Sequence, residues 1–137
     1  MGVVLLVVAA GCGGGGSRSP ESVVRSWSAA IDRGDDKSAA DTFARDAVVV
    51  QGTLQLRLHT RADAVTWNSG LPCAGKIVDL TTNGAEVRVT FVLGDRPGHR
   101  CDGPGHRAAA VFRVRKGKIV LWHQVGAGAP SSAQPEV

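Results

Sequence analysis

The chain has 137 residues, a length that fits one domain with its own hydrophobic core and argues against a second. Apolar residues make up 43% of the sequence, so the composition is that of a folded protein and not of a globally disordered chain. The net charge of +4 comes from Lys and Arg scattered among acidic residues. Because there is no basic stripe or recognition module, we expect no nucleic-acid partner.

The N-terminal residues have the pattern of a bacterial export signal. Residues 2–10 form an uninterrupted apolar run, long enough for the core of a signal peptide and too short to cross a bilayer as a helix. Residues 8–12 read VAAGC, which resembles the lipobox of bacterial lipoproteins, although no Lys or Arg precedes the run and Ala9 stands where Leu is usual. The resemblance implies a signal peptide over residues 1–12, lipidation of Cys12 and an extracytoplasmic, membrane-anchored protein, with plain secretion as the alternative.

Two segments of linker composition flank the expected domain. Residues 13–19 are rich in Gly and Ser, which predicts a flexible tether and argues against a buried N-terminal strand. Residues 126–137 contain Pro, Ser and Ala without periodicity, which predicts a disordered tail. The folded domain is therefore expected over residues 20–125.

The remaining two cysteines, Cys73 and Cys101, are expected to form a disulfide, because export places them in an oxidising compartment. Closing a loop of about 29 residues stabilises the domain by roughly 3–4 kcal/mol in the chain-entropy model. The alternative is a metal site formed by these cysteines with His99 and His106. The spacing lacks the paired C-x2-C or H-x3-H pattern of structural zinc sites, so we expect no metal.

A first helix is predicted from Pro20. Ser19 can cap it, Pro20 can occupy its first position without losing a hydrogen bond, and Gly34 is placed to end it. Its apolar face follows helical spacing and comprises Val23, Val24, Trp27, Ala30 and Ile31.

Two further helices are predicted. Asp35 or Asp36 can cap a short second helix. Its buried side is expected to comprise Ala39, Ala40 and Phe43. Residues 60–63, which read TRAD, begin a third helix that continues through Trp67.

Strand patterns account for most of the rest of the domain. They cover residues 47–51, 54–58, 77–81, 86–93, 108–115 and 118–125. Asn83-Gly84 is expected to supply the two positive φ values of a tight hairpin turn, and a second hairpin turns about Lys116-Gly117. A loop rich in Gly, Pro and His lies between these hairpins, over residues 94–106.

This order of elements is similar to that of the NTF2-like (SnoaL-like) superfamily. Local strings that resemble it are AIDRGD at residues 30–35, FARDAV at 43–48 and FRVRKGKIVLW at 112–122. The resemblance covers roughly residues 20–125 and implies an α+β fold shaped like a cone. In this fold a curved, mostly antiparallel sheet wraps on roughly three N-terminal helices, and the cone contains a pocket. Residues 71–73 and 100–105 resemble an elaboration of exported members, which implies that the disulfide ties a loop at the pocket rim.

The superfamily includes ketosteroid isomerases, limonene-epoxide hydrolases, polyketide cyclases and noncatalytic binding domains, so the fold alone does not give the function. The isomerases use a tyrosine and a protonated aspartic acid to stabilise an oxyanion and a second aspartate as base. The matching positions here are Trp27, Ala110 and Gln51, none of which can perform that chemistry. Where the epoxide hydrolases carry an acid after the last tryptophan, this chain has Gln124, which cannot titrate.

Three other titratable residues are candidates for catalysis, and each has a simpler interpretation. His123 alternates with Trp122 and is expected on the opposite face of its strand. Asp79 alternates with apolar neighbours and is expected on a solvated face, and His59 next to a helix start is expected at the surface. We therefore assign no catalytic residue and expect no cofactor.

The residues left for a pocket are aromatic rings and neutral amides, namely Trp27, Gln51, Trp67, Trp122 and Gln124. The alternative is that the three tryptophans only fill the core. The leading hypothesis is a noncatalytic, envelope-tethered domain that binds a small apolar ligand or a partner protein. The alternatives are a cyclase, isomerase or hydrolase that uses an unconventional His or Asp, and a structural module that forms a homodimer.

Overall fold

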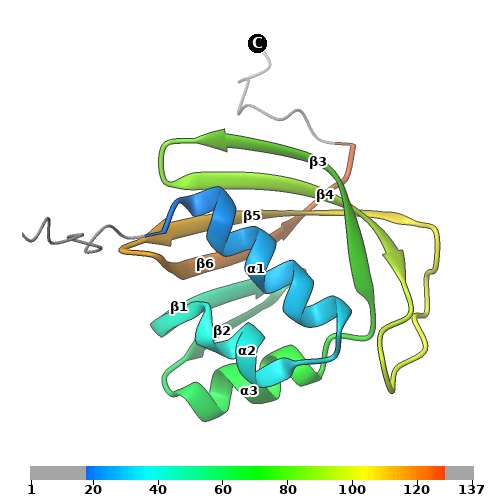
Figure 1. The fold of residues 1–137 in the computed structure, drawn as a ribbon, viewed down its shortest axis with the longest axis horizontal. Helices are drawn as coiled ribbons and strands as arrows, with labels where there is room; N and C mark the ends of the chain where they lie inside the picture. The colour runs from blue at the N-terminus through cyan, green and yellow to red at the C-terminus, as the bar shows by residue number, and fades with distance from the viewer. Residues whose placement is uncertain (1–17, 129–137) are drawn as a thin grey trace, which may run out of the picture.

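The computed structural model describes residues 18–128 (Figure 1). The predicted signal peptide, its Cys12, residues 13–17 of the tether and residues 129–137 of the tail lie outside the described residues. Residues 18–128 contain three helices, α1 (Pro20–Asp32), α2 (Asp36–Asp41) and α3 (Arg61–Ser69). The strands are β1 (Phe43–Gln51), β2 (Leu54–Leu58), β3 (Ala74–Asn83), β4 (Glu86–Gly94), β5 (Arg107–Arg115) and β6 (Lys118–Val125).

The strands form one curved sheet with the order β2-β1-β6-β5-β4-β3, in which β1 and β6 run parallel and all other neighbours are antiparallel. The helices lie against its concave face, with α1 across β3 to β6 (Figure 1). The fold is therefore α+β with a mostly antiparallel sheet, as the sequence predicts.

The helices begin where their capping residues predict. The Ser19 side chain accepts a hydrogen bond from the backbone N–H of the third helical residue of α1, and Asp35 does the same for α2. Thr60 and Asp63 form a reciprocal capping box at α3. Gly34 lies just after α1 with a φ of 73°, a conformation that glycine adopts without steric cost.

The prediction that Phe43 belongs to the second helix is wrong. The helix ends at Asp41, and Phe43 is the first residue of β1, where it pairs with Ile119 of β6. The backbone N–H of Ile119 donates to the Thr42 carbonyl at 2.8 Å, so pairing with β6 begins immediately after the helix. Tertiary pairing has overridden the local helical pattern here.

The two hairpin turns differ from each other. Lys116 and Gly117 both have positive φ, 51° and 74°, as the tight turn predicted there requires. At the other hairpin Asn83 is still in β3, and only Gly84 has a positive φ, 59°. The expected pair of positive φ values at Asn83-Gly84 is therefore wrong. Asn83 pairs with Glu86, so the two loop residues are Gly84 and Ala85, and only the first of them has a positive φ.

The core lies between α1 and the concave face of the sheet. Val23, Val24 and Ile31 of α1 are almost fully buried, as are Val87 and Phe112 on the facing strands. This packing holds α1 in place and leaves the region beside its C-terminal turn to be enclosed by loops. No helix among residues 18–128 is long and apolar enough to cross a membrane.

Candidate functional site

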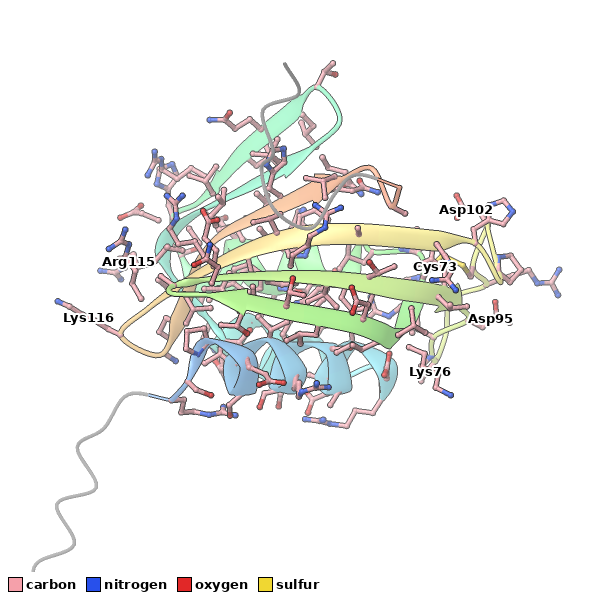
Figure 2. All side chains as sticks on the ribbon, turned by 90° about the horizontal axis from the view of Figure 1, so that it is seen from above. Cys73, Lys76, Asp95, Asp102, Arg115 and Lys116 are labelled. Carbon is pink, nitrogen blue, oxygen red and sulfur yellow. A yellow bond between two sulfur atoms is a disulfide. The ribbon has the colours of Figure 1, made fainter. Side chains whose placement is uncertain are left out.

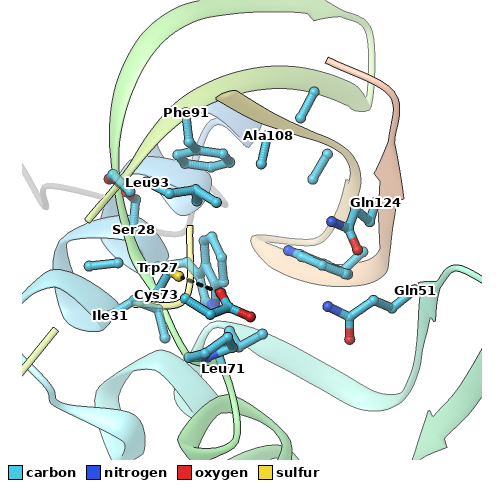
Figure 3. Close-up of a pocket in the computed structure, with 17 residues that line it drawn as sticks. Trp27, Ser28, Ile31, Gln51, Leu71, Cys73, Phe91, Leu93, Ala108 and Gln124 are labelled. Atoms are coloured by element: carbon cyan, nitrogen blue, oxygen red, sulfur yellow. Dashed lines mark hydrogen bonds between the residues drawn. The ribbon is translucent and has the colours of Figure 1, made fainter. Parts of the chain in front are cut away.

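A cavity of about 250 Å³ opens where α1 ends, β3 begins and β6 ends (Figure 3). Ile31, Leu71, Phe91 and Leu93 contribute apolar walls, and Ala108 lies at the start of β5. The concave face is therefore not filled by side chains at this end, and a small molecule has room to bind.

Four of the five residues predicted for a pocket line this cavity. They are Trp27, Gln51, Trp122 and Gln124. Trp67 is not among the lining residues; its ring packs 4.8 Å from that of Trp122 and 5.7 Å from that of Phe43, measured between ring centroids. Trp67 therefore supports the cavity wall from behind.

The two amides come together because β1 and β6 are parallel neighbours. Val49 pairs with Trp122, so Gln51 and Gln124, two residues further along each strand, share the concave face. Figure 3 shows both amide groups directed into the cavity. Each amide offers a hydrogen-bond donor and an acceptor without bringing a charge.

The two tryptophans that line the cavity differ in their hydrogen bonding. The Trp27 indole Nε1–H donates to Asn68 Oδ1 at 2.8 Å, and the Asn68 amide donates in turn to the Ala64 carbonyl, also at 2.8 Å. The Trp122 Nε1 atom is buried and has no hydrogen-bond partner among the described residues. Asn68 was not anticipated from the sequence, because a polar residue in a short helix gives no sign of a partner 41 positions away.

Gly75 also shapes the cavity wall. A Cβ atom added at Gly75 would lie 2.9 Å from the Phe91 side chain on the neighbouring strand, which is closer than such atoms normally approach. The glycine therefore lets the Phe91 ring lie over β3 at the cavity.

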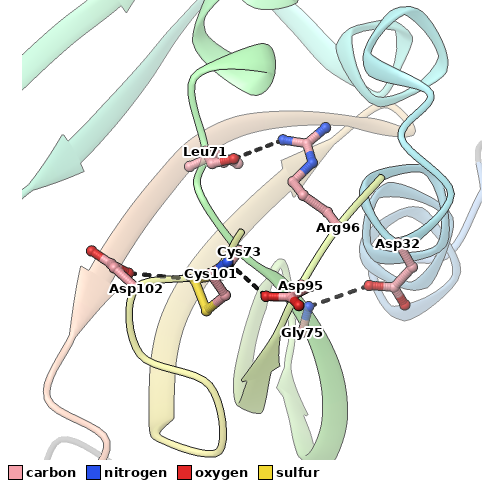
Figure 4. Close-up of a disulfide and its surroundings, with 8 residues drawn as sticks. All are labelled: Asp32, Leu71, Cys73, Gly75, Asp95, Arg96, Cys101 and Asp102. Atoms are coloured by element: carbon pink, nitrogen blue, oxygen red, sulfur yellow. Dashed lines mark hydrogen bonds between the residues drawn. A yellow bond between two sulfur atoms is a disulfide. The ribbon is translucent and has the colours of Figure 1, made fainter. Parts of the chain in front are cut away.

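The rim is cross-linked by the predicted disulfide between Cys73 and Cys101 (Figure 4). The Cys101 backbone N–H donates to Asp95 Oδ1 at 2.7 Å, which fixes the loop between β4 and β5. The Asp102 carboxylate lies 3.6 Å from Cys73 Sγ. We treat this as a contact and not a hydrogen bond, because a disulfide sulfur has no proton to donate.

The disulfide also bears on the metal-site alternative. Metal ligation by cysteine uses the thiolate, and both sulfurs are bonded to each other here. Of the four residues considered, His99 and His106 alone retain free ligand atoms in this form of the protein.

Figure 2 shows Cys73, Asp95 and Asp102 together at one end of the molecule, with Arg115 and Lys116 at the other.

Arg96, in the loop between β4 and β5, fixes this loop to the segments around it. This role of Arg96 was not predicted from the sequence. Its side chain is almost fully buried, and its Nη1 donates to the carbonyls of Asn68 at 2.8 Å and Leu71 at 3.0 Å. Its other terminal nitrogen pairs with Asp36 at the start of α2. One side chain therefore joins the β4–β5 loop to α2 and to the turn that precedes β3.

Comparisons with known proteins agree on the architecture. A scan against protein-family models and a search of curated proteins both found no match. Among solved structures, an NTF2-like protein of unknown function from Cytophaga hutchinsonii is 10% identical and superposes with a TM-score of 0.66, over 80% of this chain and 91% of that one. The chain has the NTF2-like fold.

Two further structures with this fold have more specific descriptions. A protein with a ketosteroid isomerase-like fold from Catenulispora acidiphila, in complex with trimethylamine, is 18% identical with a TM-score of 0.62, over 81% of this chain and 88% of that one. A candidate polyketide cyclase from Sinorhizobium meliloti is 17% identical with a TM-score of 0.61, over 79% of this chain and all of that one. At these identities the likeness is one of NTF2-like fold and not of activity.

Within this NTF2-like fold, the candidate catalytic residues lie away from the cavity. His59 is at the surface, with Nδ1 2.9 Å from Asp46 Oδ1. His123 is exposed on the convex face, and Asp79 is exposed on the edge strand β3. Among the described residues that line the cavity, Asp102 alone has a titratable side chain, and it is exposed at the rim.

Asp32 lies beside the cavity without lining it. Its Oδ1 accepts a hydrogen bond from the Gly75 backbone N–H at 3.2 Å (Figure 4). Partial desolvation raises the pKa of Asp32 above its usual value of 3.8, and the hydrogen bond from Gly75 opposes that shift in part. The interaction joins the end of α1 to β3 at the cavity wall.

Proposed function

We propose that this chain is an envelope-tethered, noncatalytic NTF2-like domain that binds a small, mostly apolar, uncharged molecule in the cavity. The observation that carries the proposal is an open cavity with aromatic walls and two neutral amides, in which the exposed Asp102 at the rim is the one titratable side chain among the described lining residues. Such a site can bind by apolar burial and orient a ligand by hydrogen bonds. Apart from Asp102 at the rim, no described lining residue could transfer a proton at the ligand.

The size of the cavity limits the ligand. Its volume of about 250 Å³ lies just under the range of roughly 300–1,000 Å³ typical of pockets for drug-sized molecules. A ligand of one or two rings therefore fits the proposal better than a long lipid. The structure from Catenulispora acidiphila is a complex with trimethylamine, which supports a small molecule as the occupant of a domain with this fold.

The position outside the cytoplasm is part of the proposal. The disulfide between Cys73 and Cys101 suits an oxidising compartment, and the leader with its lipobox-like end supplies the route and the anchor.

The experiment that tests the proposal combines binding with an assay for turnover. Cyclohex-3-enone has a single ring, which suits a cavity of about 250 Å³, and it becomes conjugated, with a change in absorbance, if a base shifts its double bond. We expect the protein to bind it without accelerating this isomerisation. We expect Gln51→Asp, which places a carboxylate in the cavity, to gain measurable activity, because a positioned general base contributes roughly 10²–10⁴-fold.

Two results would contradict the proposal. One is the absence of saturable binding. The other is turnover by the unaltered protein that disappears in His59→Ala or Asp79→Asn, which would show catalysis by residues that lie outside the cavity.

A further inference from the structure

We propose that the ligand carries a neutral oxygen acceptor of the carbonyl class, and that the Trp122 indole Nε1–H donates a hydrogen bond to it. This inference rests on the proposed function and adds the chemical class of the ligand and the residue that recognises it.

The inference starts from an unpaired donor. Trp122 is 6% exposed, and its Nε1 has no partner; among residues 18–128 one other buried side-chain polar atom, Arg96 Nε, shares this state. Buried indole N–H groups normally find an acceptor, because burying an unpaired donor is unfavourable. Trp27, on the same cavity, follows that rule through Asn68.

The surroundings of Trp122 narrow the chemistry of the acceptor. Among the described residues that line the cavity there is no Lys or Arg, so a carboxylate or phosphate would be buried without a counter-charge. An ammonium ligand would suit the aromatic walls and the Asp102 carboxylate at the rim, but it cannot accept a hydrogen bond from Trp122. A neutral carbonyl oxygen satisfies the indole and brings no further charge into the cavity.

The neighbouring amides extend the same site. Trp122 lies between Val49 and Phe112 on the concave face, and Gln51 and Gln124 lie one step further toward the ends of β1 and β6. A ligand whose carbonyl meets the indole therefore has two amides within the same cavity wall for a second polar group.

The competing explanation lies within the core. The Trp67 ring is 4.8 Å from that of Trp122 at an interplanar angle of 69°, and an aromatic face can receive an N–H weakly. If that contact satisfies the indole, the cavity has no preference for an acceptor, and the test below distinguishes the two cases.

The test compares cyclohexanone with methylenecyclohexane, in which a =CH2 group replaces the carbonyl oxygen. The protein is the full chain with Cys12→Ser, and dissociation constants are measured by NMR titration. The alkene is less well hydrated than the ketone, which favours its binding whether or not a hydrogen bond forms. The informative quantity is therefore the change in the ketone-to-alkene affinity ratio between variants. We expect Trp122→Phe to lower this ratio about tenfold, as the loss of one hydrogen bond to a buried donor implies. The control variant Ala62→Leu, at an exposed position on α3, should leave the ratio unchanged.

A second readout needs no variant. In the protein with all three tryptophans unchanged, the NMR signal of the Trp122 indole N–H should move downfield with cyclohexanone and not with methylenecyclohexane. The chemical shift of the Trp27 indole N–H should not change. Binding of both probes with an unchanged ratio and no such shift would overturn the inference and leave the proposed function standing. Failure of both probes to bind would contradict the proposed function itself, and the inference with it.

Discussion

Asn68 is the residue that holds the inner wall of the cavity in its observed shape. It is fully buried on α3, its side chain accepts from the Trp27 indole and donates to Ala64, and its carbonyl accepts from Arg96. A single amide therefore fixes the orientation of the Trp27 ring, while the buried Trp122 Nε1 has no hydrogen-bond partner among the described residues.

We predict that Asn68→Ala lowers the free energy of unfolding by about 2–4 kcal/mol, because it leaves the Trp27 donor unpaired and removes buried volume. Urea denaturation measures the change. The matched control is Thr66→Ala, an exposed position on the same helix, where a change within about 0.5 kcal/mol is expected. Equal stabilities for the two variants would show that the Trp27–Asn68 hydrogen bond is unimportant.

Asp32 gives a pH-dependent prediction at the same scale. Because its pKa is raised in the folded protein, the folded state binds this proton more readily than the unfolded chain, and stability from this group falls as pH rises from 3.8 through the raised pKa. Asp32→Asn keeps an oxygen acceptor for Gly75 and removes the charge. The variant should be at least as stable as the original at neutral pH, with its advantage shrinking as pH falls toward 3.8. An advantage that grows in acid would contradict this sign.

At the scale of elements, the rim depends on connections between segments far apart in the chain. The disulfide joins the start of β3 to the β4–β5 loop across 28 positions, and Arg96 joins that loop to α2 and to the turn before β3. These links fix the β4–β5 loop to the segments beside it at the rim of the cavity.

We predict that reduction of the disulfide lowers the free energy of unfolding by about 3–4 kcal/mol, and the melting temperature by more than about 10 °C. Calorimetry with and without reductant measures the effect, and the double variant Cys73→Ser, Cys101→Ser, which has no disulfide to reduce, is the control. Two titratable thiols in the unreduced protein would refute the linkage.

The helix starts and the hairpin turn that depend on neighbouring residues could be predicted from the sequence. Caps at Ser19, Asp35 and Thr60 and the turn at Lys116-Gly117 depend on neighbouring residues and agree with the structure. Periodicity placed Trp122 and Gln124 on one face for the same reason.

The parts that failed depend on distant partners. Phe43 joins a strand because β6 pairs with it, and the hydrogen bond from Trp27 to Asn68 and those from the Arg96 side chain to Asn68 and Leu71 cross 25 or more positions. On β2, Leu54 and Leu56 lie on the same face as the buried Leu58 but are 48% and 41% exposed, which agrees with the half-exposed strand that their alternation predicts. Alternation predicts which face a residue lies on, and not whether another element covers it.

At the scale of the whole molecule, the cavity and the start of the domain lie at opposite ends. The cavity is lined by the last turns of α1, while α1 begins at the end that carries Arg115 and Lys116 (Figure 2). A lipid anchor upstream of Pro20 would therefore be attached at the end of the domain opposite the cavity.

We predict that the protein expressed with its leader in a bacterial host fractionates with membranes, and that Cys12→Ser abolishes this behaviour without unfolding the domain. Immunoblots of membrane and soluble fractions measure the distribution, and circular dichroism of the variant checks the fold. Recovery of both proteins from the cytoplasm would end the lipoprotein hypothesis.

The central claim is that the cavity on the concave face is a ligand site, and filling it tests that claim most directly. Ala110 is buried, lines the cavity and pairs with Gln124, so Ala110→Leu places a larger apolar side chain in the cavity. The control is Ala62→Leu, the same change at an exposed position on α3. In NMR titrations with cyclohexanone, we predict that Ala110→Leu weakens binding at least about tenfold while its spectrum remains that of a folded protein, and that Ala62→Leu binds like the original. Equal binding by all three proteins would contradict the claim that the ligand occupies this cavity.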